Sequence, residues 1–255
     1  MTLKLVTIPC LADNYAFLLH NGATKETLLV DAPEAAPIQA ALDAHGWALT
    51  DVFLTHHHWD HVDGLAPLRE RYAPRVIGAS ADAHRLPPLD VAVDEGDNVE
   101  ICGETARIFD VSGHTVGHIA VHFPKTGVVF TADSLMALGC GRLFEGTPEQ
   151  MWESLKKLRA LPAQTTVCSG HEYTASNAAF ALSVDPNNVA LSERATAIEK
   201  ARAAGLATVP STLAEEIATN PFLRADQPDL QKAVNMEGVD PARVFAEIRI
   251  RKDNF

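Results

Sequence analysis

The sequence has 255 residues, of which 47% are hydrophobic, and a formal net charge of −12. This length allows one large domain or two modest ones, and the apolar content predicts a packed core rather than a disordered chain. The negative charge argues against general binding to nucleic acids and to anionic membrane surfaces. No apolar stretch approaches the roughly 20 residues that a membrane-spanning helix needs, and residues 1–9 do not resemble a secretory signal. The four cysteines are widely spaced and form no C-x-x-C pair, which is typical of reduced thiols in a cytoplasmic protein.

The first part of the chain alternates short apolar runs with turn residues, a pattern that favours strands. Strands are expected at 3–8, 16–19 and 27–30, and an amphipathic helix over 36–45 is expected to end at Gly46. Asp31 directly follows the third strand. Its carboxylate either caps a turn or orients a histidine that binds a metal ion.

Residues 55–61 (T-H-H-H-W-D-H) follow an apolar strand at 51–54 and contain four histidines and one aspartate. Imidazole and carboxylate groups together suit zinc, iron and manganese. In an extended segment, residues two apart point the same way, so His56 and His58 can bind one ion. If the chain then enters the helix expected over 62–71, Asp60 and His61 can turn towards a second ion. The alternative is a solvent-exposed, histidine-rich loop, which this spacing disfavours.

The same pattern, in which a strand ends and a histidine or an aspartate follows, occurs three more times. Strands are expected at 76–78, within 91–111, and at 119–123, 128–131 and 165–168, and a helix over 147–160. The residues in question are His114, Asp133 and His171. Each alone could be a turn residue. Together with His56, His58, Asp60 and His61, they provide five histidines and two aspartates, which is enough for two ions with open positions for water and substrate.

Beyond residue 173, alanine, glutamate and arginine predominate and the β-branched runs end. Helices are expected at 175–184, 189–204, 213–219, 230–234 and 241–251. The sequence therefore predicts an α+β fold with a catalytic domain at 1–173 and a helical domain at 174–255.

At this point the chain resembles a known family. T-H-x-H-x-D-H at 55–61, S-G-H-T-V-G-H at 112–118, F-T-A-D-S at 130–134 and G-H-E-Y-T at 170–174 resemble the metallo-β-lactamase superfamily. Within it, G-C-G-R at 139–142, F-E-G-T at 144–147, N-P-F-L-R at 220–224 and the C-terminal 249–255 are similar to the glyoxalase II (hydroxyacylglutathione hydrolase) family. The resemblance spans nearly the whole chain.

This resemblance implies a four-layer αββα sandwich followed by a smaller, all-helical C-terminal domain. It also implies two divalent metal ions per chain, with zinc expected and iron or manganese as alternatives. The implied ligands of one ion are His56, His58 and His114, those of the other are Asp60, His61 and His171, and Asp133 bridges them. Asp60 and Asp133 are the implied catalytic residues. His57 and His118 match no ligand; we expect His118 to be structural and His57 to be an exposed bystander.

The implied reaction is hydrolysis of S-(2-hydroxyacyl)glutathione, chiefly S-D-lactoylglutathione, to glutathione and D-lactate by a metal-bridging hydroxide, in methylglyoxal detoxification. The implied substrate contacts are Arg142, Leu143, Phe144, His171, Glu172, Tyr173, Arg249 and Lys252. Without the resemblance, the basic tail at 249–252 would be interpreted as the cationic last turn of a helix. Position 143 is leucine, where an aromatic residue is common in the family, and position 144 is phenylalanine, where some relatives carry tyrosine. A small molecule is the expected partner, and a cytoplasmic monomer is expected.

Several other functions fit parts of the pattern. A mononuclear iron persulfide dioxygenase of the same superfamily shares many of the ligands, and the metal count and the glutathione-binding tail distinguish it. A lactonase, a β-lactamase and a nuclease are further alternatives, and the negative charge disfavours the nuclease. A non-catalytic scaffold with one structural metal would need only four ligands, fewer than this chain offers.

Overall fold

The computed structural model describes residues 3–255, so Met1 and Thr2, the first residues of the predicted domain 1–173, lie outside the described part. The chain forms two compact units. Unit 1 comprises the residues up to Asp110 together with Val116–Thr131, and unit 2 comprises Val111–Thr115 and Ala132–Phe255. This grouping follows spatial contacts, and the division of the sequence near residue 173 stays a prediction.

Unit 1 contains a six-stranded sheet whose strands follow one another in sequence order. The first three strands pair antiparallel and the others parallel. Parallel neighbours need a crossover connection, which α1 (Ala35–His45) supplies between β3 and β4, and α2 (Trp59–Val62) with α3 (Leu65–Tyr72) between β4 and β5. The strands are β1 (Lys4–Cys10), β2 (Asn14–His20), β3 (Thr27–Val30), β4 (Asp51–Phe53), β5 (Arg75–Ala79) and β6 (Val91–Val93).

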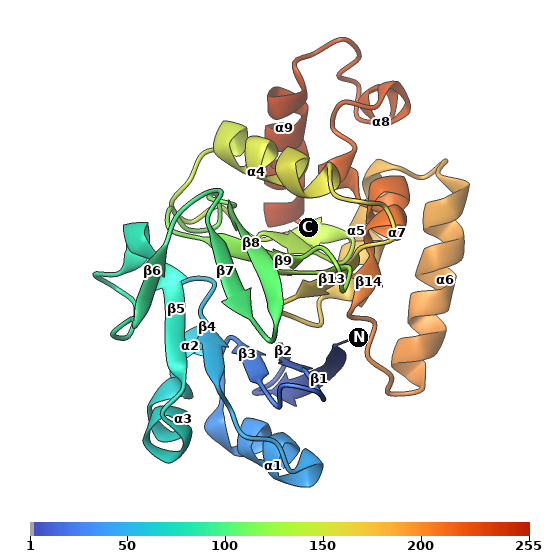
Figure 1. Ribbon diagram of the computed structural model, residues 1–255. Coiled ribbons are helices and arrows are strands. Elements are labelled where there is room, and N and C mark those ends of the chain that lie inside the picture. Colours follow the sequence, from blue (N-terminus) through green and yellow to red (C-terminus); the bar gives the residue numbers. More distant parts are fainter. Residues whose placement is uncertain (1–2) are drawn as a thin grey trace. The chain divides into compact units, whose positions relative to one another are not determined.

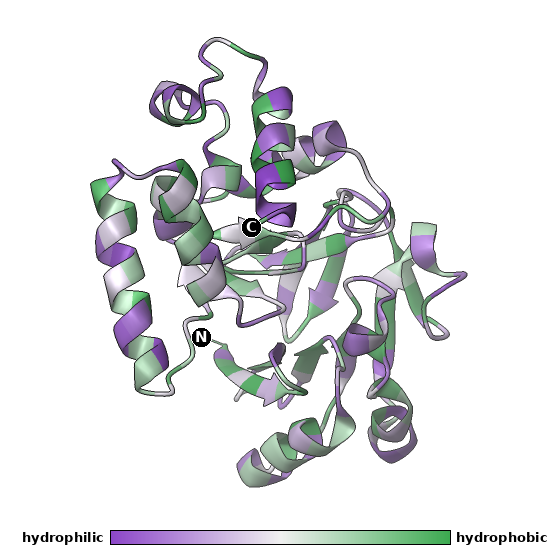
Figure 2. Ribbon diagram, turned by 180° about the vertical axis from the view of Figure 1, so that it is seen from behind, coloured by the Kyte–Doolittle hydropathy of each residue, from purple (hydrophilic) through white to green (hydrophobic). Residues whose placement is uncertain are grey.

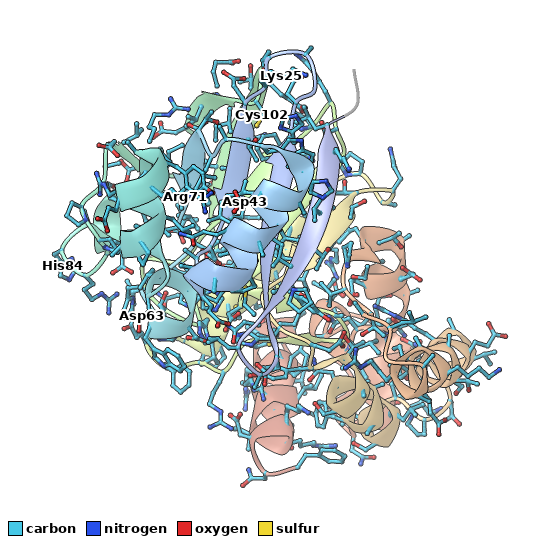
Figure 3. The ribbon with its side chains drawn as sticks, turned by 90° about the horizontal axis from the view of Figure 1, so that it is seen from below. Lys25, Asp43, Asp63, Arg71, His84 and Cys102 are labelled. Carbon is cyan, nitrogen blue, oxygen red and sulfur yellow. The ribbon has the colours of Figure 1, made fainter. Side chains whose placement is uncertain are left out.

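Helices α1 and α3 lie side by side on the same face of this sheet (Figures 1 and 3). Their apolar side chains form one buried cluster with those of the strands, and the cluster includes Ile38, Leu42, Val52, Leu65 and Leu68. On the outer side of the pair, Arg71 reaches Asp43 at 2.6 Å, where both side chains are about half exposed (Figure 3). The burial of the inner faces therefore holds these helices, because an exposed ion pair contributes little.

The continuous helix expected over 62–71 is wrong. The chain instead forms α2 and α3 with Gly64 between them. A Cβ at residue 64 would lie 2.8 Å from the Ala32 carbonyl oxygen and 2.8 Å from the amide nitrogen of Ala35, so the backbone of the preceding turn passes close to this point. The Gly64 amide donates to the Ala32 carbonyl at 2.8 Å, which ties the break to the end of β3.

Four antiparallel strands of a second sheet follow in unit 1, in the order β10-β9-β8-β7. They are β7 (Asn98–Ile101), β8 (Glu104–Asp110), β9 (Ile119–Phe123) and β10 (Val128–Ala132), and the hairpin of the last two was predicted. Phe130 on β10 packs against Phe17 on β2, with ring centroids 5.7 Å apart. Phe130 also packs against Phe123 on β9 at 6.0 Å. The aromatic rings thus fill the space between the two sets of strands.

Unit 2 is mainly helical, and the predicted helices are confirmed with small shifts at their ends. Capping boxes start two of them, Thr147 with Gln150 at α4 (Pro148–Arg159) and Thr212 with Glu215 at α7 (Leu213–Thr219). Hydrophilic and hydrophobic residues alternate along α6 (Figure 2). The remaining elements are β11 (Leu135–Met136), β12 (Gly139–Cys140), β13 (Thr166–Ser169), α5 (Thr174–Val184), α6 (Val189–Ala203), β14 (Ser211–Thr212), η2 (Pro221–Leu223), α8 (Pro228–Ala233) and α9 (Pro241–Asp253). No helix within residues 3–255 combines the length and apolar character that crossing a bilayer requires.

Candidate metal centre

The histidine-rich stretch of unit 1 joins the end of β4 to α2, and His58, the N-cap residue of α2, is extended with φ −60° and ψ 143°. The ring centroid of His56 lies 4.7 Å from that of His58 and 4.2 Å from that of His61. Ligand atoms of His56 lie within 4.8 Å of ligand atoms of His58 and of His61, and the Asp60 carboxylate lies equally close to His61. The predicted extended segment followed by a helix therefore gathers these four side chains in unit 1.

Asp31 orients this group. Its carboxylate accepts hydrogen bonds from the Thr55 amide at 2.9 Å and the Thr55 hydroxyl at 2.9 Å, and it lies 2.7 Å from Nδ1 of His61. Asp31 is buried, and it adopts a positive φ of 57° directly after β3. A proton on Nδ1 of His61 leaves the lone pair of Nε2 available to a metal ion. Of the two roles that the sequence left open, the structure therefore favours the orienting one.

A second polar support was not predicted. The Asn14 side-chain amide donates to the carbonyl oxygen and to Oδ2 of Asp60, both at 3.1 Å. Asn14 begins β2, and nothing in its sequence context distinguishes it from an ordinary turn residue.

The expectation that His57 is exposed is wrong. Only 18% of its side chain is exposed, and its Nδ1 lies 2.8 Å from Oδ2 of Asp82, a residue that is fully buried. Asp82 ends the short helix η1 (Ser80–Asp82), which follows β5. His118 is fully buried and its ring stacks on that of His56 with centroids 4.6 Å apart, which agrees with the structural role expected for it.

Unit 2 holds a second group of ligands. Oδ2 of Asp133 lies 3.5 Å from Nε2 of His114 and 3.4 Å from Nε2 of His171, and all three side chains are buried. The other ring nitrogen of His114, Nδ1, lies 2.7 Å from the Arg142 carbonyl oxygen, which fixes the orientation of the ring. Two imidazole nitrogens that converge on one carboxylate oxygen are a donor set typical of divalent transition metals. The donors of unit 2 thus fit a divalent metal ion, as do those of unit 1.

Glycine at 141 is what allows the Asp133 and His114 segments to approach one another. A Cβ at this position would lie 2.1 Å from the Asp133 carbonyl oxygen and 2.8 Å from Nδ1 of His114. The Gly141 amide donates to that same carbonyl at 2.9 Å. Any larger residue would therefore push the backbone away from two of the ligands.

The sequence matches known protein families along its length. A model of the metallo-beta-lactamase superfamily matches residues 13–171, and a model described as the hydroxyacylglutathione hydrolase C-terminus matches residues 172–255. The chain is 68% identical to a protein named hydroxyacylglutathione hydrolase from Ruegeria pomeroyi (strain ATCC 700808 / DSM 15171 / DSS-3), over 100% of both chains. The chain belongs to the hydroxyacylglutathione hydrolase family.

Solved structures agree with the fold of this family. The BLEG-1 B3 metallo-beta-lactamase aligns with a TM-score of 0.68 at 21% identity, over 86% of this chain and 99% of that one. A structure titled TTHA1623 in a di-iron-bound form aligns with a TM-score of 0.61 at 27% identity, over 86% of this chain and 100% of that one. The predicted fold class, an α+β metallo-β-lactamase sandwich followed by a helical domain, is confirmed.

The residues expected to contact substrate in this hydrolase family all lie in unit 2, where they differ in exposure. Arg142, Phe144 and Tyr173 are exposed and Leu143 is half-buried. The Tyr173 ring stacks on His171 with centroids 4.7 Å apart, and the Phe144 ring meets His114 edge-on at 5.3 Å. Two exposed aromatic rings therefore flank imidazoles of this unit that are candidate metal ligands.

Arg249 is less available to a ligand than the resemblance implied. Only 7% of it is exposed. One terminal nitrogen of its guanidinium donates to the Cys140 carbonyl at 3.0 Å and the other to Asp253 at 2.9 Å. This geometry makes Arg249 a link between α9 and the segment that precedes Arg142.

Lys252 lies partly buried near the end of α9. Its Nζ donates to the Ser176 carbonyl at 3.3 Å and lies 5.2 Å from the centroid of the Phe180 ring. Burial, and to a smaller extent the nearby Arg249 cation, lowers the pKa of Lys252 from 10.5.

Glu172, another expected substrate contact, is engaged within the protein. Its carboxylate accepts hydrogen bonds from the amide and hydroxyl of Thr208, at 2.8 and 2.6 Å, so it holds the loop after α6.

The four cysteines are buried free thiols. Burial raises the pKa of Cys10 and of Cys140 to about 11 and that of Cys102 to about 12, and it also raises the pKa of Cys168. A protonated, enclosed thiol is a poor nucleophile. The chemistry of this hydrolase family member therefore falls to the histidine and aspartate groups.

Proposed function

We propose that this chain is a binuclear metallo-hydrolase that cleaves the thioester bond of S-(2-hydroxyacyl)glutathione, chiefly S-D-lactoylglutathione, to give glutathione and D-lactate. The observation that carries the proposal is the 68% identity, over the full length of both chains, to a relative named hydroxyacylglutathione hydrolase. The two groups of buried imidazole and carboxylate ligands support it, because hydrolysis at neutral pH without a protein nucleophile requires an activated water. The biological role proposed is methylglyoxal detoxification.

We further propose how seven residues share two divalent ions. His56, His58 and His114 would hold one ion, Asp60, His61 and His171 the other, and Asp133 both. The position of the Asp133 Oδ2 atom between the two imidazoles of unit 2 supports a bridging role for its carboxylate. The relative whose title describes a di-iron-bound form also supports a count of two. Zinc is the proposed metal, with iron and manganese as alternatives that the same donors accept.

Divalent ions held by these residues would supply a water whose pKa is lowered towards ~7 and would polarise a carbonyl group. The protein's own residues have two tasks in that reaction. Asp60, whose Oδ2 is held by the Asn14 amide at 3.1 Å, is the proposed acceptor of the proton that the attacking water gives up. Asp31 would keep the proton of His61 on Nδ1, which leaves the lone pair of Nε2 available to bind an ion.

Substrate binding is proposed for exposed and partly buried groups of unit 2. Glutathione carries two carboxylates, which an acidic protein can hold only where positive charge gathers locally. Lys252 would bind the glycine carboxylate, Arg142 the peptide, and the Tyr173 hydroxyl would donate a hydrogen bond. Arg249 would act indirectly, because its guanidinium donates to the Cys140 carbonyl at 3.0 Å and so positions the segment that precedes Arg142.

The meeting of the two family models between residues 171 and 172 supports the division into a catalytic domain at 1–173 and a helical domain at 174–255. Four free, buried cysteines support a cytoplasmic location, where thiols stay reduced. We also propose that the chain acts as a monomer.

The test is to count metal ions per chain while S-D-lactoylglutathione hydrolysis is followed by thiol release. The wild-type chain should hold two ions and hydrolyse the thioester. Asp133→Ala should lose metal and rate together, whereas Asp63→Asn, a change at an exposed aspartate (Figure 3), should leave both unchanged. An absence of thioester hydrolysis in the metal-loaded wild type would refute the proposal. A single bound iron with oxygen consumption on glutathione persulfide would replace it with the dioxygenase alternative.

A further inference from the structure

A buried carboxylate lies beside the histidine-rich stretch without being one of its proposed ligands. Asp82 is fully buried, and its two oxygens contact different residues. Oδ2 lies 2.8 Å from Nδ1 of His57, and Oδ1 accepts from Nε of Arg85 at 2.5 Å. A carboxylate removed from water is costly unless hydrogen-bonded and charged partners compensate it, so both contacts help to keep Asp82 in place.

The alternation of an extended segment explains why His57 reaches Asp82. His56 and His58 point to one side of the backbone, and the residue between them must point to the other. Asp82 lies on the side of the backbone to which His57 points, so it contacts the segment on the face opposite to His56 and His58. The contact is specific in position, because it uses the nitrogen nearest the backbone, Nδ1.

A second segment of unit 1 is fitted around the same carboxylate. A Cβ at Gly117 would lie 2.5 Å from Cβ of Asp82, so the chain closes over Asp82 at van der Waals distance. Next to it, His118 stacks on the ring of His56 at 4.6 Å, and the Ile119 amide donates to the Thr55 carbonyl at 3.0 Å. Asp82 is therefore packed between the histidine-rich stretch and the segment 117–119, and that segment also contacts Thr55 and His56.

We propose that His57 is a positioning residue: its Nδ1–H, donated to Asp82, fixes the backbone between His56 and His58 so that both imidazoles face one ion. This inference rests on the metal binding in the proposed function. A loop without this anchor would sample other backbone conformations, and metal binding would then have to order it. Groups hydrogen-bonded to metal ligands typically change metal affinity 10- to 100-fold, and an anchor on the backbone between two ligands should act on the same scale.

The test compares three substitutions at position 57 with one at His84, an exposed histidine of the same unit (Figure 3). His57→Ala removes the donor. His57→Asn keeps one, because its side-chain nitrogen stands close to where Nδ1 stood. His57→Leu fills the space without a donor and serves in place of His57→Ala if that variant does not accumulate as folded protein. His84→Ala is the matched control.

The main measurement is the zinc dissociation constant of the full chain, from competition with a chromophoric chelator, with the thermal midpoint of the metal-free protein recorded alongside. His57→Ala and His57→Leu should weaken zinc binding at least ~10-fold. His57→Asn and His84→Ala should bind zinc as the wild type does. In the weakened variants kcat should fall at subsaturating zinc, with KM unchanged.

Two results would overturn the inference. One is wild-type zinc affinity in His57→Ala or His57→Leu. The other is a loss in His57→Asn as large as that in His57→Ala, because the ring rather than the donated hydrogen bond would then matter. If the wild-type chain itself binds no zinc, the proposed function fails instead, so the two failures are distinguishable.

Discussion

Asp31 offers a sharp test of how the protein controls the ligand chemistry of His61. Its Oδ1 accepts from the Thr55 amide, and its Oδ2 lies within hydrogen-bonding distance of the Thr55 hydroxyl and of Nδ1 of His61. Asp31→Asn keeps the shape of the side chain, and asparagine tolerates the positive φ at this position. The amide has only one oxygen, however, and either orientation sets a donor against a donor.

The less costly orientation keeps the oxygen on the Thr55 amide, because a buried backbone N–H without an acceptor costs about 1–3 kcal/mol. The new NH2 group then faces Nδ1 of His61, and the ring adopts the other tautomer, with its proton on Nε2. Metal binding needs the lone pair of Nε2, so it must reverse this choice. Zinc affinity should therefore fall by about 1–3 kcal/mol, or roughly 5- to 150-fold.

Asp31→Ala should behave differently, because it leaves the buried Thr55 amide without its acceptor and should cost about 1–3 kcal/mol of folding stability. Urea unfolding of the metal-free proteins and zinc competition on the same samples separate the two effects. Asp43→Asn, a change in the exposed pair with Arg71, is the control and should alter neither (Figure 3). The tautomer argument is refuted if Asp31→Asn binds zinc like the wild type, or if it destabilises the metal-free chain as much as Asp31→Ala.

Three further predictions concern charge. Lys252→Ala should raise KM with little change in kcat. Because the pKa of Lys252 is lowered from 10.5, its charge is lost as the pH increases, and KM of the wild type should start to rise before pH 10.5 is reached. A fall in kcat at constant KM would contradict the binding role. Asp253→Asn should lower KM about two- to fivefold, since its carboxylate neutralises Arg249 at 2.9 Å and Arg142 at 3.5 Å; an unchanged KM at low salt would count against this. Burial lowers the pKa of His122 from 6.5, so the unfolded chain binds more protons below that pH and stability should fall as the solution is acidified. His122→Gln should reduce this slope by up to about 1.4 kcal/mol per pH unit in urea titrations at pH 5.5–7.5, and an identical slope would exclude His122 as its source.

Much of the candidate centre followed from local patterns. The alternation His56, His58 and the turn into a helix at Asp60 and His61 are properties of a short segment, and unit 1 shows them as expected. The recurrence of a ligand after a strand likewise located Asp133. These features depend on backbone periodicity, which the sequence carries directly.

The supporting residues could not be predicted because they depend on pairing between distant segments. Asp31 reaches Thr55 because β3 and β4 pair in parallel, with Val30 beside Phe53. Asp82 meets His57 across 25 residues, and no local pattern marks the contact. The break at Gly64 reflects the nearby Ala32 backbone rather than the helical pattern around it. Similarly, the face of α9 that carries Arg249 is set by packing, which directs its guanidinium to Cys140.

The enclosed cysteines have a practical and a cellular consequence. With a pKa of about 11, Cys10 and Cys140 are ionised in only about one molecule in ten thousand at pH 7. Disulfide reagents that report the liberated thiol should therefore see the product and not the catalyst. For the same reason, reactive aldehydes that modify exposed sulfhydryl groups should leave these four cysteines unmodified.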